Sequence, residues 1–374
     1  MTTGKPMTSL AQNLLPPVCT FRLDGTLMQL SLPQDFPAPL AYEIEDEYGR
    51  IITGQIAAPA DFSLPRLSAG YHLLRLSAPE FQAEILLIIA PLQTYKTPEN
   101  SPTTYAVPFN NFKSLRQKLS REPLDSLHIT VPFPCAADLK SFYRQLFRQP
   151  QEEAKADFEP EHALYLALRS QYPVNQDYND WANNCFDYNK ITSFKTKEFA
   201  KKSADKIAVA ALALSEVDTC LREIAAFCRR HNGSVYVHSD LPLAVEYTDF
   251  IAWRDRKLLL AKNLALPDYP NYVPYSPEAL AAARYEPFIR LLRQSMSHAD
   301  VFCFDRPSAL AEQLCLDAPF EDKLLQYDLK TLLAITAIES HRHHCRIVAL
   351  RSKELASGTK EQFAAYGIDF ISPE

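Results

Sequence analysis

Three polar residues follow short apolar runs in the C-terminal half of the chain, at positions that could support chemistry. Asp240 ends the run SVYVHSD, Asp305 ends DVFCFD, and Arg351 follows CRIVAL. In sheets and barrels of parallel strands, functional groups gather where the strands end. A carboxylate such as Asp305 can take part in catalysis there, or it can serve as a hydrogen-bonding strand terminus. The residue types alone leave both roles open.

The runs that would position these groups alternate with helical patterns after residue 104. The order strand, helix, strand predicts a parallel sheet with right-handed crossovers, either open or closed into a barrel. The expected strands are residues 104–109, 126–133, 234–240, 300–305, 345–350 and 368–372. Apolar residues at helical spacing predict helices within 112–120, 161–172, 206–232, 285–299 and 329–344.

The first hundred residues predict a β domain. Short apolar or alternating runs are separated there by Pro, Gly or Asp clusters, which is typical of a small sandwich. The polar, Pro-rich segment 91–104 is the best candidate for a linker. We therefore expect a β-sandwich domain over residues 1–95 and a barrel-type domain over 96–374. The expected N-terminal strands are residues 27–32, 40–46, 50–57, 72–78 and 83–90.

Composition and charge restrict the class of protein. The 374 residues are 47% hydrophobic, which is enough to bury a sizeable core in two domains. A net charge of −6, with both signs mixed along the chain, gives no reason to expect nucleic acid or an anionic membrane as partner. No apolar run reaches the roughly 18 residues of a membrane span, and the first residues lack a signal-peptide pattern. We expect a cytoplasmic protein.

Glycine and cysteine usage argue against two further classes of site. Only 8 glycines occur, and neither G-x-G-x-x-G nor a P-loop is present, so phosphate-cradling loops are not expected. The 8 cysteines form no C-x-x-C pair, which favours buried thiols over a disulfide framework. We expect no cofactor.

Two conspicuous segments have ordinary explanations as well as functional ones. HRHHC (341–345) offers His341, His343, His344 and Cys345 as metal ligands. However, adjacent residues at a helix end rarely converge on one ion, and basic side chains there are favoured by the helix dipole. We therefore expect no metal site. The aromatic-rich run 172–190 has the composition of a carbohydrate-stacking loop, and equally that of a surface loop anchored by aromatic residues.

Several segments together resemble a known family. The run LPRLSAGYHLLRL (64–76) is similar to the end of the β domain that precedes the barrel in bacterial 4-α-glucanotransferases, the amylomaltases of glycoside hydrolase family 77. Residues 283–305 and 332–350 are more closely similar to two helix–strand units of that barrel. Weaker similarity covers 239–245 and 251–268, and residues 104–230 match poorly.

The resemblance implies a retaining transglycosidase on a (β/α)8 barrel that moves α-1,4-glucan segments between acceptors. Such an enzyme needs a carboxylate nucleophile and a carboxylic acid about 5–5.5 Å apart. Asp305 falls on the nucleophile position. The resemblance also implies glucan contacts for Asp240, Asp268, Tyr272 and Arg306, although a strand-end cap or turn role explains Asp240 and Asp268 equally well.

The chain departs from the family pattern around this centre. Cys303 stands where the family has arginine, and Arg306 where it has histidine. The family's acid/base glutamate position is occupied by Leu350, which cannot donate a proton. Glu354 could reach that position only through a gap in an otherwise ungapped match. The third catalytic carboxylate belongs on strand seven, whereas the sequence stops at Glu374 after six expected strands.

These observations leave three functional interpretations. The preferred one is a catalytically inactive relative with an open or incomplete barrel that binds malto-oligosaccharide or another protein. The second is an active 4-α-glucanotransferase that uses an acid such as Glu354. The third is a structural fragment that needs a partner chain. Self-association is also expected as one way of covering the unpaired edges of a six-stranded sheet.

Overall fold

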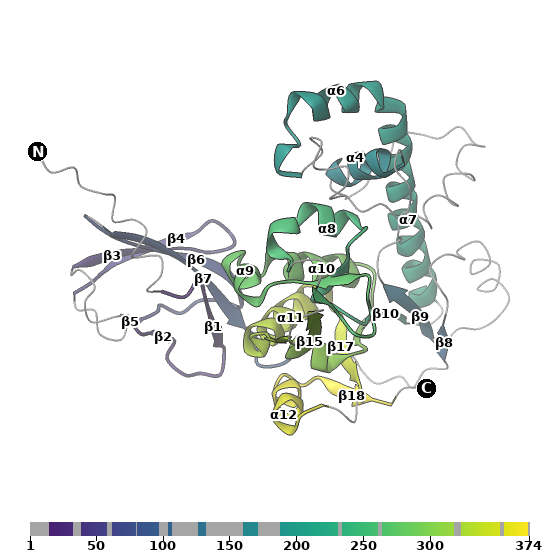
Figure 1. Cartoon of the computed structure of the whole chain (residues 1–374). Coiled ribbons are helices and arrows are strands. Elements are labelled where there is room, and N and C mark those ends of the chain that lie inside the picture. Colours follow the sequence, from purple (N-terminus) through teal and green to yellow (C-terminus); the bar gives the residue numbers. More distant parts are fainter. Residues whose placement is uncertain are drawn as a thin grey trace, which may run out of the picture.

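The computed structural model describes two contiguous parts, a β-rich N-terminal part and a larger α/β part (Figure 1). None of the described helices combines the length and the hydrophobicity that a membrane span requires. The described residues are 15–32, 39–57, 62–79, 81–96, 104–106, 126–131, 160–170, 188–230, 234–260, 264–317, 323–351 and 355–372.

The N-terminal part is built on a five-stranded sheet in the order β1-β7-β6-β3-β4. Alternate residues of its strands, such as Leu74, Ile85 and Leu87, are fully buried. The short strands β2 and β5 form a separate antiparallel pair, and Leu30 and Phe62 from this pair join the same apolar core. The full sandwich stays a prediction. The strands are β1 (Val18–Arg22), β2 (Gln29–Leu30), β3 (Leu40–Glu45), β4 (Ile51–Ile56), β5 (Phe62–Ser63), β6 (Gly70–Ala78) and β7 (Phe81–Ala90).

The C-terminal part contains a six-stranded sheet in the order β18-β17-β14-β10-β9-β8, and every neighbouring pair is parallel. The six strands expected from the sequence are therefore confirmed, each beside the next in chain order. One face, including Phe302, Phe304 and Ile347, packs into the largest apolar core. The strands are β8 (Thr104–Ala106), β9 (Ser126–Val131), β10 (Val235–Ser239), β14 (Val301–Phe304), β17 (Arg346–Leu350) and β18 (Asp369–Ile371).

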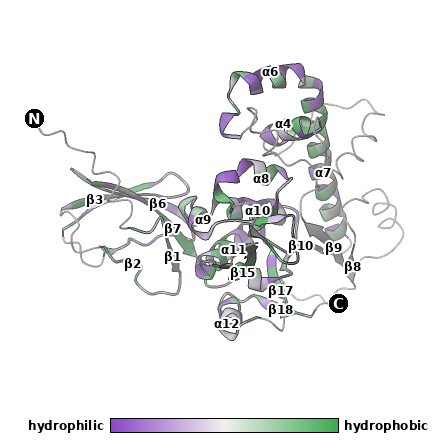
Figure 2. Ribbon diagram, in the orientation of Figure 1, coloured by the Kyte–Doolittle hydropathy of each residue, from purple (hydrophilic) through white to green (hydrophobic). Residues whose placement is uncertain are grey.

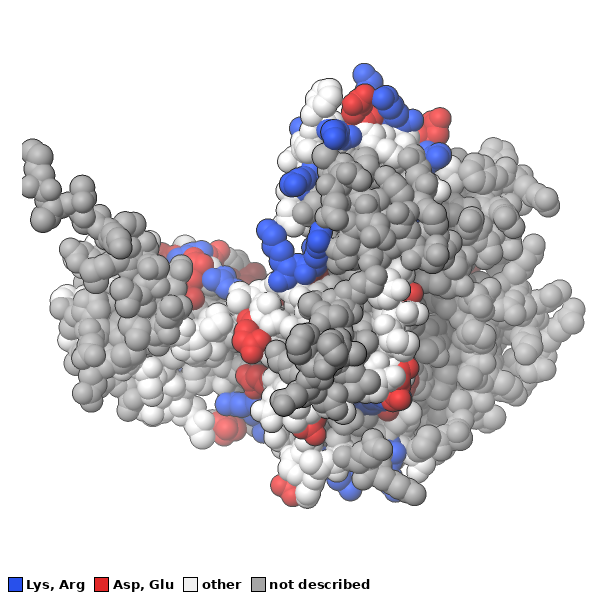
Figure 3. Space-filling model, viewed as in Figure 1, with Lys and Arg blue, Asp and Glu red and all other residues white. Residues whose placement is uncertain are grey.

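The long helical patterns are confirmed where the structure describes them. Helices α4, α6 and the upper part of α7 project from the body, and α4 packs on α7 around a separate core with Tyr165 and Trp253 (Figure 1). Lys and Arg side chains gather over α6 (Figure 3). The helices are α4 (Pro160–Arg169), α6 (Phe194–Lys202), α7 (Ala204–Arg230), α8 (Phe250–Arg254), α9 (Pro277–Ala282), α10 (Glu286–Met296), α11 (Leu329–His343) and α12 (Ser357–Ala365).

Short antiparallel strands outside the expected set decorate the parallel sheet. They form a pair, β11 with β13, and a three-stranded sheet, β12-β15-β16. They lie in the connections that follow β10 and β14, so they belong to the edge where the candidate site residues were expected. The strands are β11 (Ala244–Glu246), β12 (Leu264–Ala265), β13 (Tyr272–Pro274), β15 (Glu312–Asp317) and β16 (Lys323–Gln326).

Helix α11 joins the two parts. The Asp328 carboxylate caps its first turn by accepting from the Thr331 amide (3.2 Å), and almost every residue from Leu329 to Ser340 is buried. An apolar helix without a polar face requires partners on all sides. These are supplied by β1 and β7 of the N-terminal sheet, by α10 and by the parallel sheet (Figure 2).

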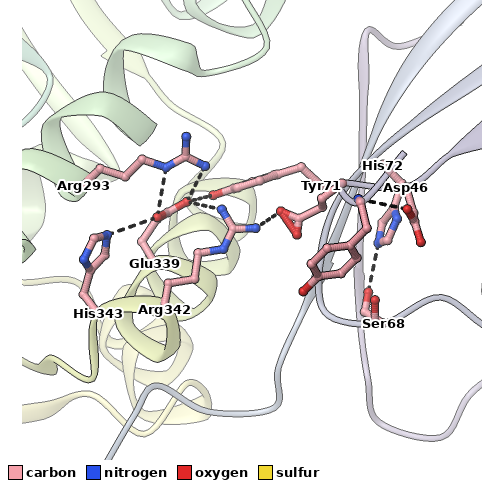
Figure 4. Close-up of polar contacts among 10 residues, drawn as sticks. Asp46, Ser68, Tyr71, His72, Arg293, Glu339, Arg342 and His343 are labelled. Carbon is pink, nitrogen blue, oxygen red and sulfur yellow. Dashed lines mark hydrogen bonds and ion pairs between the residues drawn. The ribbon is translucent and has the colours of Figure 1, made fainter. Parts of the chain in front are cut away.

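A buried carboxylate lies at this junction. The side chain of Glu339 is 0% exposed, and its oxygens accept from Arg293 Nε (3.1 Å), Arg342 Nη1 (3.0 Å) and the Tyr71 hydroxyl (2.8 Å) (Figure 4). Arg342 also pairs with Glu47 of the N-terminal part. Because a buried charge is costly unless it is paired, this network favours the one arrangement of the two parts in which Glu339 is paired, in addition to the apolar contacts.

The start of the expected linker is attached to the C-terminal part. The Thr94 amide donates to the Tyr366 carbonyl (2.8 Å), the Tyr95 amide to Ser340 Oγ (2.7 Å), and Lys96 Nζ to the Gly367 carbonyl (2.7 Å). Residues 91–96 are thus held against the C-terminal part by hydrogen bonds, whereas 97–103 lie outside the described residues. The domain boundary at residue 95 stays a prediction.

Candidate functional site

Asp305 lies at the carboxyl end of the parallel sheet, as expected. Its amide donates to the Ser239 carbonyl (3.0 Å) of the neighbouring strand. His238 and Cys303 are direct partners in the register of β10 and β14, so their side chains share one face, and Asp305 follows two residues later on that face. His238 Nδ1 lies 2.7 Å from Asp305 Oδ1. The candidate nucleophile is therefore hydrogen-bonded to a histidine.

A second polar cluster is organised by Arg306. Its Nε lies 3.3 Å from Asp240 Oδ1, its Nη1 lies 3.0 Å from Asp268 Oδ2, and its guanidinium covers the Tyr269 ring at 4.8 Å. The Tyr269 hydroxyl donates to Asp240. Partial burial, followed by this contact with Asp240, raises the pKa of Tyr269 to about 12. The ion pairs are partly exposed and contribute little stability, so their main effect is to orient the side chains.

Tyr272 joins this cluster through aromatic contact. Its ring lies edge-on to that of Tyr269, with centroids 5.6 Å apart, and its backbone pairs with Glu246 of β11. A cavity of about 200 Å³ opens beside them between β13, α10 and the segment that follows β10. Its lining includes Asp240, Glu246, Tyr269, Tyr272 and Gln294.

The structure brings Asp240, Asp268 and Arg306 into direct contact and places Tyr272 against the same group. Asp305 is on the adjoining strand end and lies outside the lining of the cavity. Tyr269 was missed as a site residue, although it lies three positions before Tyr272 in the sequence.

His238 was also missed, although one signal was available. In a strand, residues two positions apart share a face, so His238 lies on the face of Asp240, just as Cys303 lies on that of Asp305.

Comparison with known proteins agrees with this geometry. The family model for 4-alpha-glucanotransferase, glycoside hydrolase family 77, matches residues 135–350, which is more than half of the chain. The chain belongs to glycoside hydrolase family 77. The resemblance seen in the sequence is thereby confirmed.

Solved structures of two amylomaltases share the fold. The amylomaltase from Corynebacterium glutamicum matches with a TM-score of 0.64 at 16% identity, over 97% of this chain and 66% of that one. The Streptococcus agalactiae amylomaltase in complex with acarbose matches with a TM-score of 0.54 at 8% identity, over 72% of this chain and 73% of that one. The chain thus spans slightly less than two thirds of the length of the Corynebacterium protein.

Leu350, which the sequence resemblance predicts at the family's acid/base position, lies beside Asp305. Phe304 pairs with Ala349 in the register of β14 and β17, and extending that register by one residue places Leu350 beside Asp305. Leu350 packs against the small apolar cluster of Val301, Cys303 and Val348 on the same face. The next residue, Arg351, is exposed, and its amide donates to the Ile371 carbonyl (2.8 Å). Glu354 lies outside the described residues.

The histidines of HRHHC each contact neighbouring groups of the protein. His341 Nε2 lies 2.9 Å from the Gln93 carbonyl, His343 faces Glu339, and the His344 ring lies edge-on to Tyr95 at 5.2 Å. Among the described residues these side chains form no group with metal-ligand spacing. Sugar contact is one of the two roles that the sequence suggests for the run 172–190. Only residues 188–190 of that run are described, so the prediction lies mostly outside the described residues.

Proposed function

We propose that this family 77 protein binds α-1,4-glucan at the end of its parallel sheet and does not transfer it. The observation that carries the proposal is the position of Leu350 beside Asp305. A retaining mechanism needs a second carboxyl group about 5–5.5 Å from the nucleophile. Leucine offers no proton at that place, and the general acid/base contribution to catalysis is about 10²–10⁴-fold.

The state of Asp305 also supports the loss of transfer. Its carboxylate is engaged by His238 at 2.7 Å. In the neighbouring cluster, Asp240 and Asp268 are both engaged by Arg306, which neutralises carboxylates that could otherwise assist a charged transition state. The part of the chain described around Asp305 therefore favours binding over bond cleavage.

Glucan is the ligand class that best suits the cavity. Tyr269, Tyr272 and Tyr275 present aromatic surface, while Asp240, Glu246 and Gln294 offer hydrogen-bonding groups. Sites for small molecules combine such apolar and aromatic lining with a few polar groups that fix orientation. The Streptococcus agalactiae amylomaltase, a family member with the same fold, was solved with acarbose bound.

We further propose that the parallel sheet is part of a barrel wall. Its six strands follow one another in chain order, as barrel strands do, and their short apolar cluster around Val301 and Val348 faces away from α10 and α11. In that arrangement Asp240, Asp305 and Leu350 line the carboxyl-terminal mouth, where barrel enzymes bind substrate.

Incubation with maltotriose tests the absence of transfer. Chromatography should show only maltotriose, with neither longer nor shorter oligosaccharides, because the strand beside Asp305 carries leucine at the acid/base position. Disproportionation that disappears in Asp305→Asn would identify an active 4-α-glucanotransferase instead. Calorimetric titration with maltoheptaose should show saturable binding. Absence of heat at millimolar sugar would reject glucan as the ligand and favour a protein-binding or structural role.

Removal of the Tyr269 ring tests the location of binding. Tyr269→Ala is expected to weaken maltoheptaose binding about tenfold, which corresponds to about 1.4 kcal/mol, because it deletes the aromatic surface beside Asp240 and Arg306. Tyr48→Ala is the matched control, since Tyr48 is 76% exposed on the N-terminal sheet. Equal affinity of both variants in calorimetry would place the glucan elsewhere.

A further inference from the structure

A histidine, a cysteine and an aspartate converge on one face of the parallel sheet. His238, Cys303 and Asp305 place one ligand atom each, and these atoms all lie within 4.8 Å of one another. The backbone imposes the grouping, because His238 and Cys303 are register partners on adjacent strands and Asp305 is two residues beyond Cys303. Such a grouping does not depend on the conformation of long side chains.

The spacing is close to that of a metal-binding set. Zinc binds thiolate sulfur at about 2.3 Å and imidazole nitrogen or carboxylate oxygen at about 2.0–2.2 Å, so tetrahedral ligand atoms lie roughly 3.3–3.6 Å apart. His238 Nδ1 and Asp305 Oδ1, now 2.7 Å apart, would separate slightly to admit an ion.

The surroundings are also those of a site with an open position. Cys303 is fully buried, whereas the His238 and Asp305 side chains are 13% and 21% exposed. The soft ligand therefore lies at the base of the group, and the two harder ligands lie at its solvent side. Three protein ligands with access for water are the arrangement of zinc sites that keep a fourth, exchangeable position.

We propose that His238, Cys303 and Asp305 bind a thiophilic divalent transition-metal ion of the zinc type. On binding, the thiol proton of Cys303 passes to solvent, and the imidazole of His238 binds through the Nδ1 lone pair with its ring proton on Nε2, so the ion replaces the hydrogen bond between His238 and Asp305. The ion supplies positive charge to a carboxylate and a thiolate at the mouth of the sheet. This assignment departs from the expectation of no metal site, which considered only the cluster HRHHC.

Titration of the full-length, reduced and chelator-dialysed chain with Co²⁺ tests the site. We expect a thiolate-to-cobalt charge-transfer band that saturates at one ion per chain and disappears when Zn²⁺ is added. Excess Mg²⁺ should leave the band unchanged, because a hard ion does not compete for thiolate. Absence of the band at saturating Co²⁺ would overturn the proposal, since the three residues would then form only a hydrogen-bonded group.

Two cysteine variants distinguish this site from other thiols and from the surface histidines. Cys303→Ala should abolish the band, whereas Cys345→Ala, which removes an equally buried thiol beside the same sheet, should retain it. Retention of the band in Cys303→Ala would refute the assignment. Asp305→Asn preserves the shape of the site and covers the case in which Cys303→Ala does not fold. Because it removes a direct ligand, it should weaken Zn²⁺ binding by at least about tenfold, which is the lower end of the loss caused by mutating an outer-shell partner, and unchanged affinity would exclude Asp305 as a ligand.

Discussion

Replacing Glu339 by alanine is expected to lower the free energy of unfolding by about 3 kcal/mol. Breaking a buried ion pair costs about 3–5 kcal/mol because the partners lose their counter-charge. The lower end applies here, since Arg293 and Arg342 retain partial exposure to solvent. The Tyr71 hydroxyl also loses its acceptor at the junction of the two parts. Urea denaturation followed by circular dichroism measures the change.

Two further variants make this test specific. Glu339→Gln keeps a hydrogen-bonding side chain of the same size and should fall between wild type and Glu339→Ala. Glu361→Ala removes an exposed carboxylate of α12 whose described partner is Ser357, and it should shift the free energy of unfolding by less than about 0.5 kcal/mol. If Glu339→Ala and Glu361→Ala unfold at the same urea concentration, the junction network does not hold the two parts together.

Replacing Asp249 by asparagine is expected to stabilise the protein at neutral pH by about 2 kcal/mol. Asp249 caps α8 by accepting from the Phe250 amide (2.6 Å), and its carboxyl faces cavities rather than open solvent. Burial raises its pKa to about 6, because desolvation outweighs this hydrogen bond. At pH 7 the folded state therefore carries a poorly solvated charge, whose cost is about 1.4 kcal/mol per pKa unit before allowance for partial solvation.

The raised pKa of Asp249 also predicts how the free energy of unfolding depends on pH. Between about pH 4 and pH 6 the folded state binds this proton more tightly than the unfolded state, so the stability of the wild type falls as pH rises through that window. Asparagine removes the titration and keeps the cap. The difference in free energy of unfolding between Asp249→Asn and wild type should thus grow from near zero at pH 4 to its full value above pH 6.

Comparison of Asp249→Asn with wild type separates the pH dependence caused by Asp249 from an opposite pH dependence caused by His162. Burial lowers the pKa of His162 to about 4, and this histidine makes stability rise with pH between about 4 and 6.5. Both proteins contain His162, and the pKa of His162 is set by burial and by Arg254 rather than by Asp249, so its contribution largely cancels in the difference. Asp205→Asn, an exposed position in the first turn of α7, should show a difference that does not vary with pH. A similarly flat profile for Asp249→Asn would show that its carboxyl stays ionised without penalty.

The main regular elements could be predicted because apolar residues run through each of them. The six parallel strands are short apolar runs, α7 and α11 are much longer ones, and the alternation of strands with helices predicts which strands are neighbours. Strands such as β5 and β12, of two residues each, have no detectable period. Their pairing depends on tertiary contacts, and so they were missed.

The same distinction holds for the candidate site. Asp240 and Asp305 could be predicted because their place follows directly from where a strand ends. The contact of His238 with Asp305 joins residues 67 positions apart, and that of Tyr269 with Asp240 joins residues 29 positions apart. Neither pairing has a local signal, since each depends on the register of strands and on the loops after them. The ability of Arg306 to hold two carboxylates was likewise visible only in three dimensions.

The position of α11 has a consequence for how the protein melts. This helix lies against β1 and β7 on one side and against the parallel sheet on the other, so its apolar side chains belong to the hydrophobic cores of both parts. Unfolding of either part would therefore expose apolar surface of the other part to water. The chain should therefore behave as one cooperative thermodynamic unit with a single melting transition, although its architecture looks like two modules.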